Sequence, residues 1–168
     1  RSALEGSEKG LGPEHRDTLK IVERLARLLK TKGDYAGAEP LYRRVLEVFE
    51  KTLSPEDPDT LWHVDNLADL LKKKGDYAGA EALYRRVLEV REKARGVDHE
   101  LTLHSVNDLA GLLETKGDYA GAEALYRRAL DGWEKFYSPP VSSARDLAEL
   151  LRKKGDYAGA EALDRRVL

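Results

Sequence analysis

The chain of 168 residues contains no cysteine and no methionine. Without cysteine it can form neither a disulfide nor a thiolate metal site. Its apolar stretches stay far below the roughly 18 residues of a membrane-spanning helix. A charge excess is also lacking, because 29 basic and 31 acidic residues leave a net charge of -2, so no long-range field favours nucleic acid or anionic lipid. We therefore expect a cytoplasmic protein that binds neither nucleic acid nor membrane.

The most abundant feature of the chain is internal repetition. The segment Gly-Asp-Tyr-Ala-Gly-Ala-Glu begins at Gly33, Gly75, Gly117 and Gly155. The spacings are 42, 42 and 38 residues (75 minus 33, 117 minus 75, 155 minus 117), which is in the range of solenoid repeats. We expect a single repeat array over residues 1–168, made of a helix tail at 1–10, full repeats at 11–52, 53–94 and 95–136, and a shortened, truncated repeat at 137–168.

The second full repeat predicts two helices, A and B, because its apolar residues twice follow the three-and-four spacing of a helix face. Helix A is expected to begin at Pro58, behind an Asp57 N-cap, and to end at a left-handed Gly75. Asp76 is then expected to cap helix B, which begins at Tyr77. The two adjacent arginines of each helix B are expected to be solvated structural residues, the first of them in an ion pair with a glutamate four residues earlier.

No residue pattern indicates catalysis. Of the four histidines, His99 and His104 are five residues apart, whereas the zinc-protease motif places its two histidines four apart on one helix face. No glycine-rich phosphate loop is present, and no nucleophile can be paired with a base. We therefore expect no catalytic residue, no metal and no cofactor, and the chain is not predicted to be an enzyme.

Small and aromatic residues mark the two helices of the second repeat: Leu67-Ala68 in helix A, and Gly75-Asp76-Tyr77, Ala80 and Tyr84-Arg85-Arg86-Val87-Leu88 in helix B. This motif resembles the tetratricopeptide repeat. Ordinary members repeat every 34 residues, whereas the longer spacing is similar to the kinesin light chain branch. The resemblance implies an all-α fold, a right-handed α-solenoid of antiparallel helix pairs, in which the A helices line a concave groove that binds extended peptides.

Candidate peptide-binding residues follow from aligning the A helices on Leu67-Ala68. Helix B is nearly unchanged between repeats, whereas the implied groove positions differ in every copy. The sequence variation is therefore concentrated where a ligand would bind. Drift of an unused exposed surface is the alternative explanation. With Trp62 and His104 as central anchors, we expect a protein or peptide partner that has an apolar anchor flanked by charged residues. The predicted residues are Lys20, Glu23, Arg27, Lys30, Trp62, Asp65, Asn66, Asp69, Lys72, His104, Asn107, Asp108, Glu114 and Arg145.

Two other functions stay open. The chain begins and ends inside a helix B, so it could be an assembly element that forms homo-oligomers through incomplete terminal helices. The near-identical B helices and the absence of methionine and cysteine also fit an engineered repeat scaffold that has no natural ligand.

Overall fold

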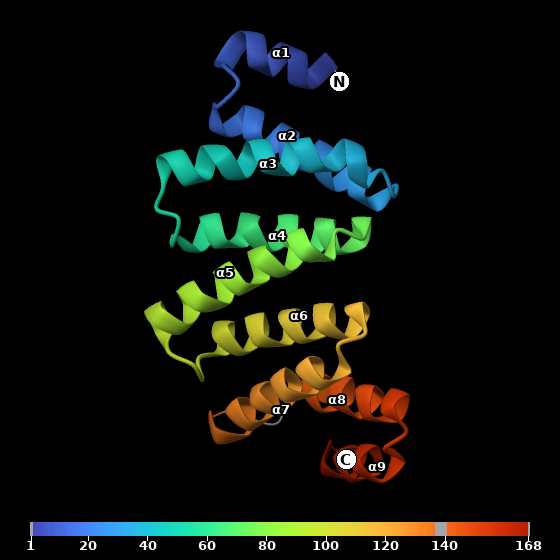
Figure 1. Cartoon of the computed structure of the whole chain (residues 1–168). Coiled ribbons are helices and arrows are strands. Elements are labelled where there is room, and N and C mark those ends of the chain that lie inside the picture. The colour runs from blue at the N-terminus through green and yellow to red at the C-terminus, as the bar shows by residue number, and fades with distance from the viewer. Residues whose placement is uncertain (1, 137–140, 168) are drawn as a thin grey trace. The chain divides into compact units, whose positions relative to one another are not determined.

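The computed structural model describes residues 2–136 and 141–167, and within these ranges the secondary structure is helical (Figure 1). The helices are α1 (Ser2–Leu11), α2 (Arg16–Thr31), α3 (Tyr35–Thr52), α4 (Pro58–Lys74), α5 (Tyr77–Arg95), α6 (Glu100–Lys116), α7 (Tyr119–Phe136), α8 (Val141–Lys154) and α9 (Tyr157–Val167). The even-numbered helices are the predicted A helices and the odd-numbered ones the B helices. This stack of sequentially packed helix pairs confirms the predicted fold class. The sequence Ser138-Pro139-Pro140 predicts a break between two helices, because residues before proline avoid helical backbone, and this prediction lies outside the described residues.

The chain forms two compact units, Arg1–Leu83 and Tyr84–Leu168, with the boundary inside α5. In the first unit α1 packs on α2, α2 on α3 and α3 on α4. In the second unit α6 packs on α7, α7 on α8 and α8 on α9. Each of these helices therefore buries its apolar face against its neighbours in the chain, as in repeat proteins generally. The repeat boundaries and the right-handed superhelix stay predictions.

The predicted helix ends are confirmed in the second repeat. The helix α4 begins at Pro58, the Asp57 side chain accepts a hydrogen bond from the backbone of the first turn, and Gly75 ends the helix with a φ of 90°. Two histidines serve as N-caps in the same way, because the side chains of His15 and His99 each accept a hydrogen bond from a first-turn backbone N–H at 3.2 Å. Local capping thus accounts for these two histidines without any ligand.

The second glycine of the repeated motif fits against the cap of helix B. In α5 the Gly79 N–H donates to Asp76 Oδ1 at 3.0 Å. A Cβ at Gly79 would lie 2.5 Å from Asp76 Oδ2 and 3.1 Å from Leu71 Cδ1. The same close approach, at 2.4–2.5 Å from a carboxylate oxygen, recurs at Gly37, Gly121 and Gly159. A side chain at this position would therefore displace the capping carboxylate, which explains why the glycine recurs.

Small residues let the paired helices approach closely, as expected. The alanine after the second glycine is buried in all four copies, with exposures of 0–1% at Ala38, Ala80, Ala122 and Ala160. In the second unit, Tyr126 and Leu130 of α7 share a core with Leu113 of α6 and Leu147 of α8. The first unit has a comparable core around Leu19, Val22, Val45 and Val48.

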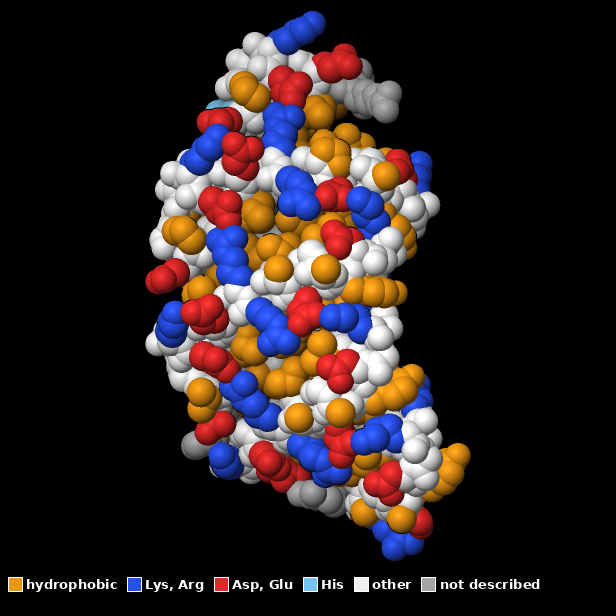
Figure 2. All heavy atoms as spheres, viewed as in Figure 1, with side chains coloured by type: hydrophobic (Ala, Val, Ile, Leu, Met, Phe, Trp, Pro, Cys, Tyr) orange, Lys and Arg blue, Asp and Glu red, His pale blue; other side chains and the backbone are white. Residues whose placement is uncertain are grey.

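The arginine pairs of helix B divide into two roles. The first arginine behaves as predicted, since Arg43 and Arg127 lie 2.8 Å from the glutamate four residues earlier. The prediction of a solvated residue was wrong for the second arginine in two of the repeats, Arg44 and Arg128, which are half-buried and reach back to the preceding helix B. Arg44 pairs with Glu8 at 2.6 Å and Arg128 with Glu92 at 2.5 Å. Side chains of both charges are interspersed over the face shown in Figure 2.

Candidate functional site

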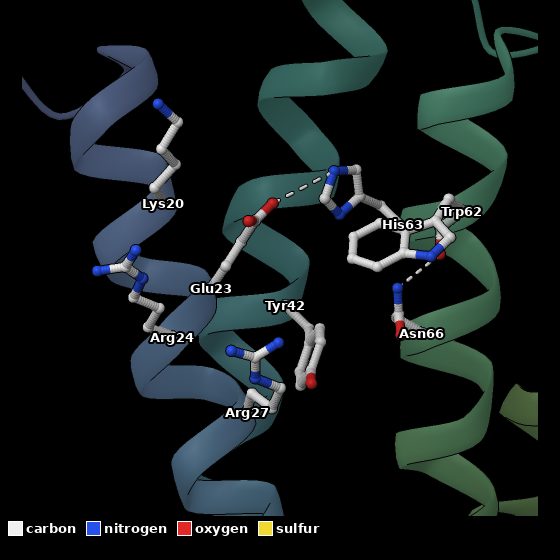
Figure 3. Close-up of a pocket in the computed structure, with 8 residues that line it drawn as sticks. All are labelled: Lys20, Glu23, Arg24, Arg27, Tyr42, Trp62, His63 and Asn66. Atoms are coloured by element: carbon white, nitrogen blue, oxygen red, sulfur yellow. Dashed lines mark hydrogen bonds and ion pairs between the residues drawn. The ribbon is translucent and has the colours of Figure 1, made fainter.

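The first unit contains a pocket of about 320 Å³ between α2, α3 and α4 (Figure 3). Five of the predicted peptide-binding residues line it: Lys20, Glu23, Arg27, Trp62 and Asn66. Three further lining residues were not assigned to the site from the sequence: Arg24, Tyr42 and His63. The pocket therefore combines side chains from two successive A helices with one aromatic ring from the helix B between them.

The amphipathic pattern of α2 directs its polar face to the pocket. Glu23 and Arg24 each lie three or four residues from both Lys20 and Arg27, so the four side chains share one side of the helix. Val22 and Ala26 are fully buried. Packing of the apolar side therefore fixes the rotation of α2, and with it the direction of the four charged side chains.

Trp62 provides an exposed aromatic surface at the pocket. Its side chain is 57% exposed although it is the largest residue on α4. The ring lies edge-on to that of His63, with centroids 4.8 Å apart, and the Trp62 carbonyl accepts a hydrogen bond from Asn66 Nδ2 at 2.9 Å. An exposed, partly supported indole of this kind is a typical anchor in protein recognition.

Glu23 and His63 meet inside the pocket. His63 is only 4% exposed, and its Nε2 lies 3.4 Å from Glu23 Oε1, as the dashed line in Figure 3 shows. The imidazole also packs on the ring of Phe49 at 4.1 Å. Burial lowers the pKa of His63, against an opposing effect of Asp59. Burial raises the pKa of Glu23, against the nearby positive charge of Arg27.

Positive charge dominates the rest of the lining. Lys20 forms an ion pair with Asp17 at 2.9 Å. By contrast, neither the Arg24 nor the Arg27 guanidinium lies within ion-pair distance of a carboxylate in the described part of the chain. With Glu23 as the only carboxylate among the lining residues, the pocket is suited to an anionic group.

Other predicted residues of the first unit contact each other instead. Lys30 and Asp69 form an ion pair between α2 and α4, and Lys30 Nζ also lies 5.8 Å from the centroid of the Tyr42 ring. Burial, with the negative charge of Asp69, raises the pKa of Tyr42. Asp65 and Lys72 are half-buried and do not line the pocket.

In the second unit the predicted residues hold helices together. Asn107 of α6 donates to Asp146 of α8 at 3.1 Å. Glu114 of α6 accepts a hydrogen bond from the Tyr126 hydroxyl at 3.0 Å and pairs with Lys153 of α8 at 2.7 Å. Two of the predicted binding positions are thus occupied by contacts between successive A helices.

The remaining predicted residues of the second unit lie at its surface. His104 is exposed and lies edge-on to the buried Trp133, with ring centroids 5.1 Å apart. Asp108 and Arg145 are exposed.

Over the described residues, no group of three or more histidine, aspartate or glutamate side chains could hold a metal ion. No helix in the described ranges is long and apolar enough to cross a membrane.

Comparisons with known proteins agree with this architecture. Models of the tetratricopeptide repeat match residues 17–93, 57–135 and 107–168. No curated protein matches the chain in a sequence search. Solved structures do match, among them a putative kinesin light chain from Podosopora anserina with nearly identical TPR-like repeats. That structure is 25% identical, has a TM-score of 0.82, and is aligned over 99% of this chain and 81% of its own.

Two more distant structures share the fold. BtubC (BKLC) from P. vanneervenii is 22% identical, with a TM-score of 0.78 over 99% of this chain and 68% of its own. The apo form of RapI is 17% identical, with a TM-score of 0.78 over 99% of this chain and 61% of its own.

The likeness to kinesin light chain repeats that the spacing predicted is confirmed. The chain belongs to the tetratricopeptide repeat family, whose members are in general protein–protein interaction modules.

Proposed function

We propose that the pocket of the first unit binds an extended segment of a partner protein. An apolar side chain of that segment lies against Trp62, and acidic side chains next to it meet Arg24 and Arg27. The observation that carries the proposal is the combination of a 57% exposed indole with two guanidiniums that lie outside ion-pair distance of every carboxylate among the described residues. Hot spots of protein recognition are enriched in tryptophan and arginine for the same reasons of area and bidentate hydrogen bonding.

The size of the pocket limits what it can hold. A volume of about 320 Å³ is at the lower end of ligand sites, which is enough for one or two side chains of a longer segment. Burial of one apolar side chain contributes about 1.5–3 kcal/mol. The charged contacts at the pocket are partly solvated and add specificity more than affinity. We therefore expect the partner to bind through a short motif.

Calorimetry with defined peptides tests the proposal. The acidic probe is a capped pentapeptide with a central leucine and two glutamates on each side; its matched control has lysines in place of the glutamates. We expect the acidic peptide to bind and the basic one not to bind, because the lining has three cations and one carboxylate. Equal binding of the two peptides would show that charge does not select the partner.

One tryptophan variant and one tyrosine control distinguish an effect on binding at the pocket from an effect on the stability of the fold. Trp62→Ala is expected to weaken binding of the acidic peptide about tenfold, which corresponds to about 1.4 kcal/mol, without lowering the free energy of unfolding. Tyr157→Ala is the matched control, because Tyr157 is a 69% exposed aromatic residue outside the pocket. An unchanged affinity in Trp62→Ala would reject the anchoring role.

Light scattering of the protein alone tests the alternative of self-association. A strictly monomeric protein would exclude that alternative.

A further inference from the structure

We infer that Glu23 and His63 form a proton-binding pair that couples occupation of the pocket by an acidic segment to the uptake of one proton. The inference rests on the proposed function and adds its regulation: the acidic segment binds more tightly as the pH falls. Proton and ligand then reinforce each other, since the coupling between two binding equilibria is reciprocal.

The first argument is that the fold does not require a titratable group at this position. Alignment on the repeated Leu-Ala pair shows that Ile21, Ser105 and Ser143 take the place of His63 in the other repeats. His63 is nevertheless 4% exposed and lies 3.4 Å from a carboxylate oxygen of Glu23. In Figure 3 the Glu23 side chain extends from α2 directly toward the imidazole on α4.

The second argument concerns the charges that surround the pair. The charged and titratable side chains near it are Asp17, Lys20, Arg24 and Arg27 of α2, Tyr42 of α3, and Asp59 of α4. Lys20 is paired with Asp17, and Lys30 with Asp69, so that each of these pairs largely cancels. The two guanidiniums against the Glu23 carboxylate leave the lining a net charge of +1 (2 minus 1) when His63 is neutral.

The site of protonation does not change the outcome. A proton taken from solvent adds one positive charge whether it binds the free imidazole nitrogen of His63 or a carboxylate oxygen of Glu23. In both cases the net charge of the lining rises by one unit, and attraction for an anionic ligand increases. One added unit charge about 6–8 Å from the ligand charge, in a partly solvated site, is expected to tighten binding about threefold to tenfold.

The directions of the pKa shifts set the pH range. The pKa of His63 is lowered from 6.5 and that of Glu23 is raised from 4.5, in both cases mainly by burial. His63 therefore takes up its proton below its ordinary pKa, and Glu23 above its own. An anionic ligand favours the protonated pair and shifts its midpoint to higher pH.

The experiment uses a ligand that does not titrate in this range. In the probe peptide, cysteic acid replaces the glutamates, because sulfonates stay ionised throughout. Calorimetric titrations at pH 7.5 and at about pH 5, each in two buffers of different ionisation enthalpy, measure both the affinity and the number of protons taken up. We expect an affinity about threefold to tenfold higher at the lower pH, with net proton uptake on binding. NMR spectra of ¹³C-labelled histidine should show the His63 midpoint rising when the peptide is added.

Variants separate the coupling from a structural role. The double variant Glu23→Gln with His63→Ser is expected to bind the peptide with the same affinity at both pH values, and His104→Ser, in the second unit, is the matched histidine control. Binding by the wild-type protein that is independent of pH, without proton uptake, overturns the coupling and leaves the proposed function standing. Absence of binding at every pH overturns both. The wild-type calorimetry decides these outcomes even if the double variant does not fold.

Discussion

Removal of one tyrosine hydroxyl is expected to destabilise the second unit, whereas the same change at the equivalent tyrosine of the first unit is expected to have little effect. Tyr126 and Tyr42 occupy the same position of helix B in two repeats. The Tyr126 hydroxyl donates to Glu114 at 3.0 Å, whereas that of Tyr42 makes no hydrogen bond to any residue that the structure describes. Burial, with the Glu114 carboxylate, raises the pKa of Tyr126, so its hydroxyl stays a donor at ordinary pH.

The expected magnitude follows from the surroundings of Glu114. A hydrogen bond to a charged acceptor contributes about 1.5–3 kcal/mol. The Glu114 side chain is 17% exposed and keeps its contact with Lys153 when the hydroxyl is removed, so we expect Tyr126→Phe to lose about 1.5 kcal/mol, the lower end of that range. Tyr42→Phe keeps all ring contacts, including the approach of Lys30 at 5.8 Å, and should change stability by less than about 0.5 kcal/mol.

Urea unfolding followed by tryptophan fluorescence measures this difference. For Tyr126→Phe the reporter is Trp133, which is 8% exposed and lies in the second unit, with Trp62→Phe removing the other signal. For Tyr42→Phe the reporter is Trp62 of the first unit, with Trp133→Phe removing the other signal. With typical urea slopes, a loss of about 1.5 kcal/mol lowers the midpoint by roughly 0.5–1.5 M. A double-mutant cycle with Glu114→Gln isolates the coupling between the two side chains. An unchanged midpoint in Tyr126→Phe, or equal shifts for both tyrosines, would refute the assigned hydrogen bond.

Three further substitutions test the packing of helix B. Pro40 lies inside α3 and cannot donate a backbone hydrogen bond, so Pro40→Ala should raise the unfolding free energy by about 1–3 kcal/mol in denaturant melts, and a decrease would contradict this. Gly79→Ala should lower it by about 1 kcal/mol despite the better helix propensity, because the new Cβ displaces the Asp76 cap; thermal melts showing stabilisation would contradict the cap. Tyr84→Ala should cost about 3–5 kcal/mol, since Tyr84 is 6% exposed, and a loss below about 1 kcal/mol would mean that helix B is wrongly registered.

Much of the local structure could be predicted because its signals lie within a few residues. Asp57 and Pro58 mark the start of α4, and Gly75 and Asp76 mark the turn into α5, each through its own backbone geometry. Because these signals recur along the chain, the length of the repeat could also be predicted. The requirement for Gly79 could not be predicted in the same way, because it depends on where the Asp76 carboxylate lies once the cap has formed.

Contacts between repeats were the part that local rules missed. The spacing rule for helices identified the pair of Arg43 with Glu39, but the partner of Arg44 is Glu8, 36 residues earlier. The period of the chain carries a signal for it, because Arg128 and Glu92 are also 36 residues apart. Comparison of charged positions one repeat apart would therefore have indicated a bridge between successive B helices.

At the candidate site, too, some residues could be predicted from the sequence, whereas those that depend on contacts between helices could not. Alignment of the A helices brought Trp62 and Asn66 to the positions that line the pocket with α2. Tyr42 and His63 were missed because their exposure depends on the three-helix arrangement: Tyr42 belongs to the apolar face of helix B, yet it remains half-buried at the edge of the pocket. His63 differs from its counterparts Ile21, Ser105 and Ser143 in the other repeats, and that difference is the sequence signal for it.

Variation among the A helices has a third explanation besides ligand recognition and drift. The position held by Lys30 in the first repeat is held by Glu114 in the third. Lys30 pairs with an acid, Asp69, whereas Glu114 pairs with a base, Lys153. The next A helix offers both partners in each case, because Asp69 corresponds to Glu149 and Lys153 corresponds to Lys73. A change of charge at this position therefore selects another partner on that helix, so variability alone does not identify a binding residue. The informative residues are those that vary and also form no ion pair among the described residues, and in the first unit this criterion selects the exposed Arg24 and Arg27, which line the same pocket as Trp62.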